Sequence, residues 1–334
     1  MLNSLDIDYI YTRSKPSLDA LAGNTILLTG GTGFFGKWFL ALFNHYNSLS
    51  DNKIDLVIPS RNPDLFLENN QEFETPYFRF LKCDLQNLPV LQGIDYIIHA
   101  AADVQTGMNV QDEERYLYDS KKATSRILNQ ALNCKKLLFT SSGAVYGNHF
   151  STDPLPKELD SLSPSTPYGI SKVIAEEQIS DFCTKNNIAY SIARCFSFIG
   201  PLCPLTGNYA LGNFINDGLN NRDITILGNG KPLRSFLYMG DLVVSLLRML
   251  TSDSVSSIYN IGSQEIVSIE DLAHSINRHF PNINVQVKST YNGESIPKYV
   301  PSIDKALEDQ IIREPLNFKD SLDLTVSWYQ MYHS

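Results

Sequence analysis

The segment Thr25–Gly36, TILLTGGTGFFG, carries the strongest structural signal in this 334-residue sequence. Thr25–Thr29 is a short apolar run that predicts a buried strand, and Lys37–Tyr46 has the pattern of a helix. Glycines between a first strand and a first helix let the chain turn tightly and let backbone N–H groups approach a pyrophosphate. The segment therefore predicts a dinucleotide-binding turn. Its expected contacts are Gly30, Thr32, Gly33, Phe34, Phe35 and Gly36.

Short apolar runs alternate with helical patterns over the first two-thirds of the chain. The expected strands are Thr25–Thr29, Asp55–Pro59, Phe78–Leu81, Tyr96–His99, Leu137–Thr140 and Ala189–Ala193. The expected helices include Lys37–Tyr46, Glu114–Asn133 and Tyr168–Thr184. This alternation is typical of βαβ units, in which helices cover both faces of a parallel sheet. We therefore expect an α/β fold, a Rossmann-type doubly wound parallel sheet with a smaller C-terminal substrate-binding lobe.

The pattern of the chain changes after Gly200, where proline and glycine become frequent. The turn Gly228–Gly230 separates two strand-like pieces, Asp223–Leu227 and Arg234–Met239, which we assign to a small lobe. The next expected elements are a helix, a strand and a helix, namely Asp241–Leu250, Ser257–Ile261 and Ser268–Phe280. The expected division is an N-terminal extension (1–22), a dinucleotide-binding domain (23–200, joined by 240–262) and a substrate-binding lobe (201–239 and 263–334).

Composition narrows the class of protein. Hydrophobic residues make up 43% of the chain and charged residues 19%, which is typical of a globular protein. The net charge of -9 argues against a general nucleic-acid binder, which would carry a basic stripe. We see no apolar stretch near the ~20 residues that span a bilayer, no signal-peptide pattern and no C-x-x-C pair among the five cysteines. We therefore expect a cytoplasmic protein without a metal site or a membrane or nucleic-acid partner.

The end of the second expected strand bears on the choice of dinucleotide. An NAD site usually has an acidic residue there, whose carboxylate accepts a hydrogen bond from the ribose 2′-hydroxyl. Here the strand ends in Ser60 and Arg61, a hydroxyl and a guanidinium that suit a 2′-phosphate. The sequence therefore favours NADP(H), with NAD(H) possible. A solvated surface charge is the competing interpretation of Arg61.

The ends of the third and fourth expected strands supply further candidate contacts. Asp84 follows the third strand, where its carboxylate can accept from an adenine amino group, and Leu85 is its neighbour. The small residues Ala100, Ala101 and Ala102 follow the fourth strand and leave room for a cofactor to cross the strand ends.

Tyr168 and Lys172 begin a helix that follows a proline-rich loop. Their spacing of four places both side chains on one helix face. An ammonium beside a phenol favours the phenolate, so it lowers the pKa of the tyrosine from its ordinary value of ~10. Tyr168 is therefore a candidate general acid or base for interconverting an alcohol and a carbonyl. The Tyr168–Lys172 pair gains weight because it follows the dinucleotide-binding turn and the strand and loop Phe139–Gly143, which contains Thr140, a candidate cofactor contact.

Seven motifs together resemble those of the extended short-chain dehydrogenases/reductases of the nucleotide-sugar epimerase/dehydratase group. They are TGGTGFFG (29–36), CDL (83–85), HAA (99–101), SSGAVYG (141–147), YGISK (168–172), RCFSFIGP (194–201) and RSFLYMGDL (234–242). The resemblance extends from about Gly23 to the C-terminus. It implies a nucleotide-activated sugar as the substrate and hydride exchange between a nicotinamide and a sugar carbon.

The same resemblance assigns roles to individual residues. Ser142 would bind the substrate oxygen, Tyr168 would move the proton, and Lys172 would hold the cofactor ribose and depress the pKa of Tyr168. The loop after Arg194, including Cys195 and Ser197, would contact the nicotinamide end of the cofactor. The implied substrate contacts are Asp103, Val104, Ser142, Gly143, Asn213 and Arg234. The resemblance also implies a homodimer through the helices Glu114–Asn133 and Tyr168–Thr184.

Departures from the family pattern narrow the expected reaction. The 4,6-dehydratases of the family carry Asp-Glu after the catalytic hydroxyl, and the decarboxylases carry the Glu, whereas this chain has Gly143 and Ala144. Neither residue transfers protons, so elimination and decarboxylation are disfavoured. Two polar positions also differ, with Ser197 and Ser120 where Asn is usual.

These departures and the Ser60–Arg61 pair favour NADP(H)-dependent reduction of a nucleotide-linked 4-keto-6-deoxy sugar, which the resemblance places in surface-polysaccharide synthesis. The first alternative is a nucleotide-sugar 4-epimerase with tightly bound NAD. The second is a non-catalytic dinucleotide-sensing protein on the same fold.

Overall fold

A computed structural model describes residues 2–101, 108–151, 154–207, 209–290, 293 and 295–332. The chain divides into two compact units. The first comprises Met1–Gly147, Ser161–Cys195 and Val243–Tyr259. The second comprises Asn148–Asp160, Phe196–Leu242 and Asn260–Ser334. Among the helices of the described ranges, none is both long enough and apolar enough to cross a membrane.

The first unit is built on a seven-stranded sheet with the strand order β11-β6-β5-β4-β1-β2-β3. Its strands are β1 (Thr25–Thr29), β2 (Asp55–Ser60), β3 (Phe78–Lys82), β4 (Tyr96–His99), β5 (Lys136–Ser142), β6 (Ala189–Cys195) and β11 (Ser256–Ile261). β1 pairs in parallel with both β2 and β4, so the chain winds outward from β1 in two directions. The order reverses between β1 and β4, and ligands bind at the carboxyl ends of the strands at such a switch point in open α/β sheets.

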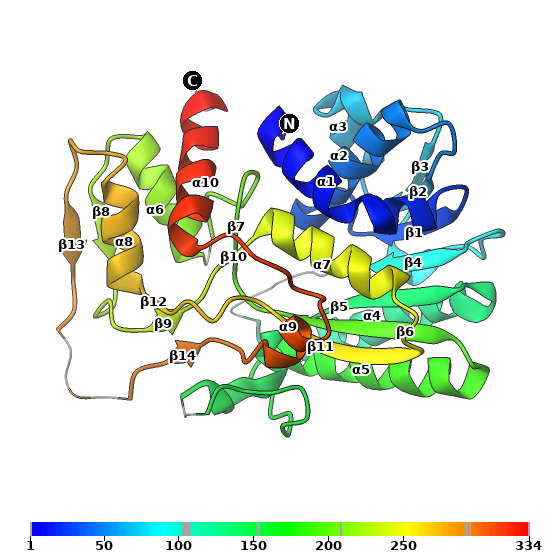
Figure 1. The fold of residues 1–334 in the computed structure, drawn as a ribbon. Coiled ribbons are helices and arrows are strands. Elements are labelled where there is room, and N and C mark those ends of the chain that lie inside the picture. The colour runs from blue at the N-terminus through cyan, green and yellow to red at the C-terminus, as the bar shows by residue number, and fades with distance from the viewer. Residues whose placement is uncertain are drawn as a thin grey trace. The chain divides into compact units, whose positions relative to one another are not determined.

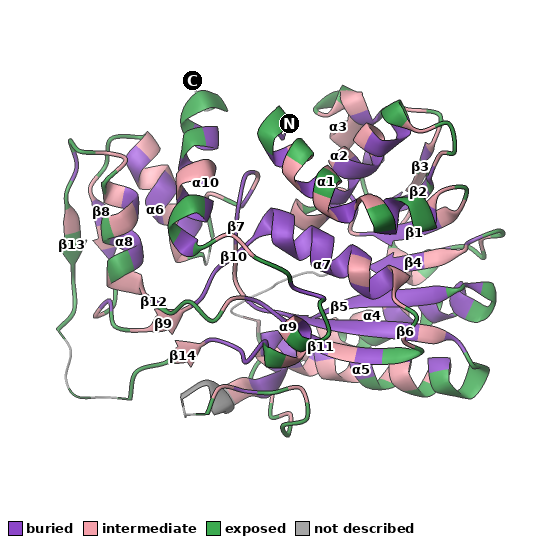
Figure 2. Cartoon of the chain, viewed as in Figure 1, coloured by how far each residue is buried: buried purple, intermediate pink, exposed green. Residues whose placement is uncertain are grey.

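Helices cover the sheet because the strands are apolar on both faces. The helices of this unit are α1 (Ser4–Leu21), α2 (Phe34–Leu49), α3 (Pro63–Glu68), α4 (Val110–Leu128), α5 (Pro167–Asn186) and most of α7 (Met239–Thr251). α4 and α5 lie on one face of the sheet, and α1 and α2 lie on the other (Figure 1). Strand residues such as Leu27, Ile97 and Leu137 form a core with Ile127 of α4 and Ile179 of α5. Figure 2 shows the central strands buried, whereas the outer face of α5 is intermediate to exposed.

Short 3-10 helices complete the first unit. They are η1 (Gln71–Phe73), η2 (Leu85–Asn87), η3 (Ala131–Asn133) and η4 (Gly143–Ser151), the last of which runs into the second unit. η4 begins directly after β5, so the loop that follows Ser142 is folded rather than extended. Gly147 in this loop has φ 56°, and a Cβ there would lie 1.7 Å from the Ser163 carbonyl oxygen, so only glycine fits.

The second unit combines short strands with helices. Its strands are β7 (Phe198–Ile199), β8 (Ile224–Ile226), β9 (Leu233–Arg234), β10 (Leu237–Tyr238), β12 (Val267–Ser268), β13 (Val285–Val287) and β14 (Lys298–Tyr299). Its helices are α6 (Ala210–Leu219), α8 (Ile269–Asn277), α9 (Asp304–Glu308) and α10 (Phe318–Tyr332). β9 lies between β12 and β14, β8 pairs with β13, and β10 pairs with β7.

Three features differ from the sequence-based expectations. The prediction of a single strand over Arg234–Met239 is wrong. Its first residue belongs to β9, which pairs with β12, and Leu237 and Tyr238 form β10, which pairs with β7. Met239 already begins α7. The expected N-terminal extension is mostly the helix α1, which packs on α2 within the first unit. Residues 148–160 belong to the second unit, where Asn260 donates to the Pro156 carbonyl at 3.0 Å.

Candidate active site

The glycine-rich turn joins β1 to α2 at the switch point of the sheet. Gly30 has φ +73°, and a Cβ there would lie 2.7 Å from the Ala100 carbonyl oxygen of the segment after β4. Gly33 caps α2 and donates its N–H to the Gly30 carbonyl at 2.9 Å. A Cβ on Gly36 would lie 2.3 Å from the same carbonyl oxygen. The turn is therefore compact, and the N-terminus of α2 faces the strand ends, as a pyrophosphate site requires.

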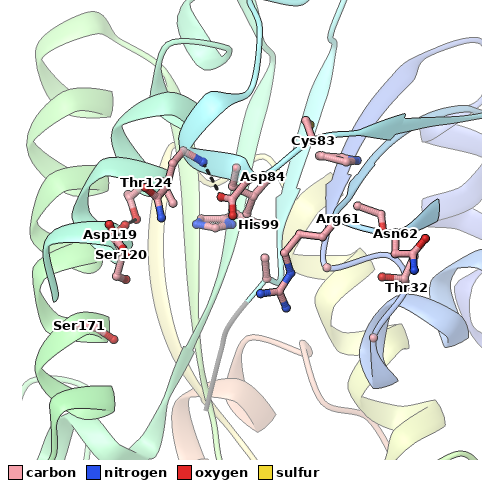
Figure 3. Close-up of a pocket in the computed structure, with 18 of the residues that line it drawn as sticks. Thr32, Arg61, Asn62, Cys83, Asp84, His99, Asp119, Ser120, Thr124 and Ser171 are labelled. Atoms are coloured by element: carbon pink, nitrogen blue, oxygen red, sulfur yellow. Dashed lines mark hydrogen bonds between the residues drawn. The ribbon is translucent and has the colours of Figure 1, made fainter. Parts of the chain in front are cut away.

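A cavity of about 1180 Å³ opens at this edge of the first unit. It is lined from the glycine turn, from the ends of β2 and β4, and from α3, α4 and α5 (Figure 3). Of the residues proposed from sequence, Gly30, Thr32, Gly33, Ser60, Arg61, Asp84, Leu85, Ala101 and Lys172 line it. A glycine cradle and a cavity of this size suit an elongated dinucleotide. The described residues therefore fit the expected cofactor.

Other proposed contacts do not line the cavity. Phe34 and Phe35 begin α2, with their ring centroids 5.9 Å apart. The residues Gly36, Ala100, Thr140, Ser142, Gly143, Tyr168 and Cys195 belong to the same unit but do not appear in the cavity wall. Ala102, Asp103 and Val104 lie outside the described residues.

The cavity wall includes residues that the sequence analysis missed. Lys37 follows the last glycine of the turn, and Asn62, Asn69 and Asn70 surround α3. One face of α4 contributes a further set: Asp112, Arg115, Tyr116, Asp119, Ser120, Ala123 and Thr124. Their recurrence every three or four residues was a readable signal of a shared face, although the sequence does not say what that face meets.

The end of β2 brings a hydroxyl, a guanidinium and an amide to the cavity. Ser60, Arg61 and Asn62 all line it, and Figure 3 shows Arg61 and Asn62 near Thr32 of the glycine turn. Within the described cavity wall, no carboxylate comes from β2 or α3. Asp64 of α3 is instead paired with Lys82 at 2.7 Å.

Asp84 lies at the end of β3 and begins the 3-10 helix η2. Its carboxylate accepts a hydrogen bond from the Gln86 N–H at 3.0 Å, drawn as the dashed line in Figure 3. Asp84 also lines the cavity, so its carboxylate is oriented at the wall by the backbone of η2.

Lys172 is a buried ammonium on α5, 5% exposed. Its Nζ donates to the Thr140 carbonyl oxygen at 2.8 Å and lies 4.7 Å from the centroid of the Phe139 ring. The same Nζ lies 5.7 Å from the centroid of the Tyr168 ring, one turn earlier on the helix. Burial lowers the pKa of Lys172 to about 8. Tyr168 and Lys172 therefore come together as the spacing predicted.

Ser142 ends β5 and is 6% exposed. Its Oγ accepts a hydrogen bond from the Ala144 N–H at 3.2 Å, which fixes the side chain at the start of η4. Thr166 caps α5 by accepting from the Gly169 N–H at 3.1 Å, so the first turn of the helix that carries Tyr168 is also fixed.

His99 is a neutral, packed residue at the end of β4. Thr29 Oγ1 accepts from the Ala101 N–H at 3.2 Å and lies 2.8 Å from His99 Nδ1. Burial, aided by Lys172, lowers the pKa of His99 to about 3. The imidazole therefore adds no charge beside Lys172 at neutral pH.

The remaining proposed residues belong to the second unit. Ser197 accepts from the Leu237 N–H through its carbonyl at 3.0 Å, and Asn213 donates its side-chain amide to the Gly207 carbonyl at 2.8 Å. Arg234, on β9, donates to the Leu233 carbonyl at 2.9 Å, and its guanidinium carbon lies 5.8 Å from the centroid of the Tyr299 ring.

Residues 26–262 match the family model described as "NAD dependent epimerase/dehydratase family". The chain belongs to the NAD-dependent epimerase/dehydratase family. The match covers the sheet, the glycine turn and the Tyr168–Lys172 helix, and so confirms the resemblance found in the sequence.

Two curated relatives and one solved structure illustrate the family's range. The chain is 27% identical to a dTDP-D-glucose 4,6-dehydratase of Dictyostelium discoideum, over 77% of this chain and 62% of that protein. It is 27% identical to a putative UDP-glucose 4-epimerase of Methanocaldococcus jannaschii, over 90% and 94% respectively. The UDP-glucuronic acid 4-epimerase of Bacillus cereus, solved with UDP-glucuronic acid and NAD, superposes with a TM-score of 0.78. Its identity is 24%, over 92% of this chain and 100% of that one.

Proposed function

We propose that this protein is an NAD-linked 4-epimerase of a nucleotide-activated sugar. The observation that carries the proposal is the buried Lys172 ammonium, which lines the cavity, binds the Thr140 carbonyl and lies one helical turn from Tyr168. This arrangement suits proton exchange at a sugar alcohol beside a dinucleotide.

Each residue of the group has a distinct proposed role. The dinucleotide, when bound, supplies the nicotinamide that accepts and returns a hydride. Tyr168 takes the proton from the sugar hydroxyl and later returns it, and the Lys172 ammonium stabilises its phenolate form. Ser142, held by the Ala144 N–H, orients the reacting oxygen through a hydrogen bond.

The relatives support epimerisation better than the ketoreduction that the sequence analysis favoured. Among them are a putative UDP-glucose 4-epimerase and a UDP-glucuronic acid 4-epimerase. The Dictyostelium discoideum relative is named a dehydratase. In this chain, however, Gly143 and Ala144 follow Ser142, so no carboxylate stands there to remove and donate protons in water elimination. We therefore assign neither dehydration nor decarboxylation to this chain.

The second unit supplies the proposed nucleotide contacts. We propose that Arg234 binds the sugar-nucleotide diphosphate, with Asn213 as a further contact. Arg234 is half-buried, and burial lowers its pKa, so a phosphate partner would compensate for lost hydration. Arg234→Ala is expected to raise KM for the sugar nucleotide about tenfold while kcat changes less, because ground-state binding is what it removes. A change confined to kcat would contradict this role.

A turnover assay tests the proposed reaction. The purified chain is incubated with UDP-, dTDP-, CDP- and GDP-hexoses, with and without added NAD, and the sugar nucleotides are separated by chromatography. We expect a C4 epimer to form from one of these hexoses without net change in dinucleotide. Formation of a 4-keto-6-deoxy sugar, or no product with any of them, would contradict the proposal.

A second candidate is a ketoreductase that uses NADPH, and one observation favours it. Ser60, Arg61 and Asn62 line the cavity where an NAD site usually has a carboxylate. Stoichiometric oxidation of NADPH with a 4-keto-6-deoxy sugar nucleotide would support this candidate over the epimerase.

Arg61→Ala separates the two interpretations of the guanidinium. If Arg61 binds a 2′-phosphate, the variant is expected to weaken NADPH binding about tenfold and NADH binding less than twofold. Fluorescence titration with both dinucleotides measures this. Equal changes for NADPH and NADH would show that Arg61 does not bind a 2′-phosphate and would remove the reason for a reductase.

The homodimer through α4 and α5 stays a prediction. Sedimentation velocity of the purified chain tests it, and a monomer at micromolar concentration would contradict it.

A further inference from the structure

A buried ion pair lies one helical turn beyond Lys172. Glu176 on α5 and Arg194 on β6 are 5% and 3% exposed. Arg194 donates to the Glu176 carboxylate through Nε at 3.1 Å and through Nη2 at 2.8 Å. Ser141 donates its hydroxyl to the same carboxylate at 2.5 Å, and the Tyr146 hydroxyl accepts from Arg194 Nη1 at 2.9 Å.

The ion pair connects the elements that carry the proposed catalytic residues. Ser141 precedes Ser142 on β5, and Arg194 precedes Cys195 on β6. The strand register places Ser141 opposite Arg194 and Ser142 opposite Cys195. Glu176 follows Lys172 by four residues on α5, so the two side chains lie on one helix face. Glu176 therefore contacts both strands at the level of the site.

A buried ion pair contributes little net stability, because the cost of desolvating both charges offsets their attraction. An apolar pair of similar volume would serve the core as well. Its position beside a buried lysine therefore calls for an electrostatic explanation.

Among the described groups around Lys172, Glu176 is the ionised group that favours the ammonium form of the lysine. His99 of β4 is neutral, because burial lowers its pKa to about 3. Cys195 of β6 is a thiol, because burial raises its pKa to about 12. Thr140 and Phe139 of β5 contribute a carbonyl and a ring, and Tyr168 of α5 contributes a phenol. Burial opposes the Lys172 charge, whereas Cys195 and the Glu176 carboxylate both favour it. Of these two, the carboxylate carries the charge at neutral pH, because burial raises the pKa of the Cys195 thiol.

We propose that Glu176 is a positioning residue that keeps Lys172 an ammonium, and that Arg194 sets the strength of this effect by neutralising most of the carboxylate charge. The inference rests on the proposed catalytic use of Lys172. Ser141 and Tyr146 hold the pair in place through their hydrogen bonds. Loss of the Glu176 charge is therefore expected to disfavour the ammonium form of Lys172, whereas loss of the Arg194 charge is expected to favour it.

A titration that needs neither sugar nor dinucleotide tests this proposal. The protein is labelled with ¹³C at lysine Cε, and the Lys172 signal is assigned by its absence from Lys172→Met. We expect the titration midpoint of Lys172 to fall by about one pH unit in Glu176→Gln, because the supporting charge is lost and Arg194 is left unpaired. We expect it to rise in Arg194→Met, because the carboxylate is no longer neutralised. The double variant is expected to titrate between Glu176→Gln and the wild type, because the part of the carboxylate charge that Arg194 leaves uncompensated is also lost.

Glu177→Gln is the matched control, since Glu177 is the next residue of α5 and is exposed. It changes the net charge equally and is expected to leave the Lys172 midpoint in place. Shifts of the same sign in both single variants, or no shift in either, would overturn the proposal. If Glu176→Gln does not fold, Arg194→Met alone decides, since a fall or no change there contradicts it.

The same variants distinguish a failure of this proposal from a failure of the proposed function. If the wild-type protein turns over no sugar nucleotide but the Lys172 midpoints shift as expected, the electrostatic role stands and the proposed reaction fails. If turnover is found, its decline on the alkaline side is expected at lower pH in Glu176→Gln than in the wild type.

Discussion

Tyr168→Phe is expected to lower kcat about 10²–10⁴-fold, the usual contribution of a positioned acid or base. The substitution removes only the phenolic oxygen and keeps the ring, which lies 5.7 Å from Lys172 Nζ at its centroid. The cavity wall does not include this residue, so binding of NADH is expected to change less than twofold. Steady-state turnover and fluorescence titration of NADH measure the two effects separately.

Tyr118→Phe provides the control for this change. Tyr118 lies on α4 and is 65% exposed, so the same loss of one hydroxyl is expected to leave kcat unaltered. A Tyr168→Phe variant with wild-type turnover would exclude Tyr168 as the proton carrier. If the wild type binds dinucleotide but no variant or substrate reveals turnover, the non-catalytic sensor becomes the better account.

Gly36→Ala is expected to cost about 3 kcal/mol of folding free energy, which is the upper end for overpacking a tight site. The new Cβ would lie 2.3 Å from the Gly30 oxygen and from the Gly31 carbonyl carbon and oxygen. These are backbone atoms of the turn, so the clash is relieved only by moving the turn away from α2. We therefore also expect NADH binding to weaken at least about tenfold, as measured by fluorescence titration alongside urea unfolding.

Gly228→Ala is the matched control for a glycine in a turn. A Cβ there meets no atom within 4 Å, and its backbone lies outside the left-handed region. Its unfolding free energy is expected to stay within about 0.5 kcal/mol of the wild type. Wild-type stability and NADH binding in Gly36→Ala would show that α2 and the glycine turn are not packed as described.

The parallel sheet was predictable because its strands are apolar and separated by helical patterns. Thr25–Thr29 and Tyr96–His99 match β1 and β4 at both ends. The prediction of one strand over Arg234–Met239 was wrong, because β9 and β10 pair with separate neighbours, and this pairing rather than the local pattern decides where they end. The helix α1 was also missed, since its pattern is polar and includes Pro16. Its stability comes from packing on α2, which the sequence does not show.

Local spacing was also enough to find part of the candidate site. The residues of the glycine turn are neighbours in the sequence, and Tyr168 and Lys172 are only a few residues apart. The sequence therefore places the members of each group together. The pairing of Glu176 with Arg194 depends on the register between β5 and β6 and on where α5 packs. The α4 face of the cavity depends on the same tertiary packing. Such contacts join distant segments, and a single sequence does not encode them in a local pattern.

Isotope labelling at C4 distinguishes epimerisation of the sugar from the loss of water that a dehydratase catalyses. UDP-, dTDP-, CDP- and GDP-hexoses carrying deuterium at C4 are incubated with the purified chain, and the products are examined by mass spectrometry and proton NMR. We expect a C4 epimer that keeps its deuterium, because the hydride removed from C4 returns to the same carbon. A product that has lost the label, or a 4-keto-6-deoxy sugar formed by loss of water, would contradict it.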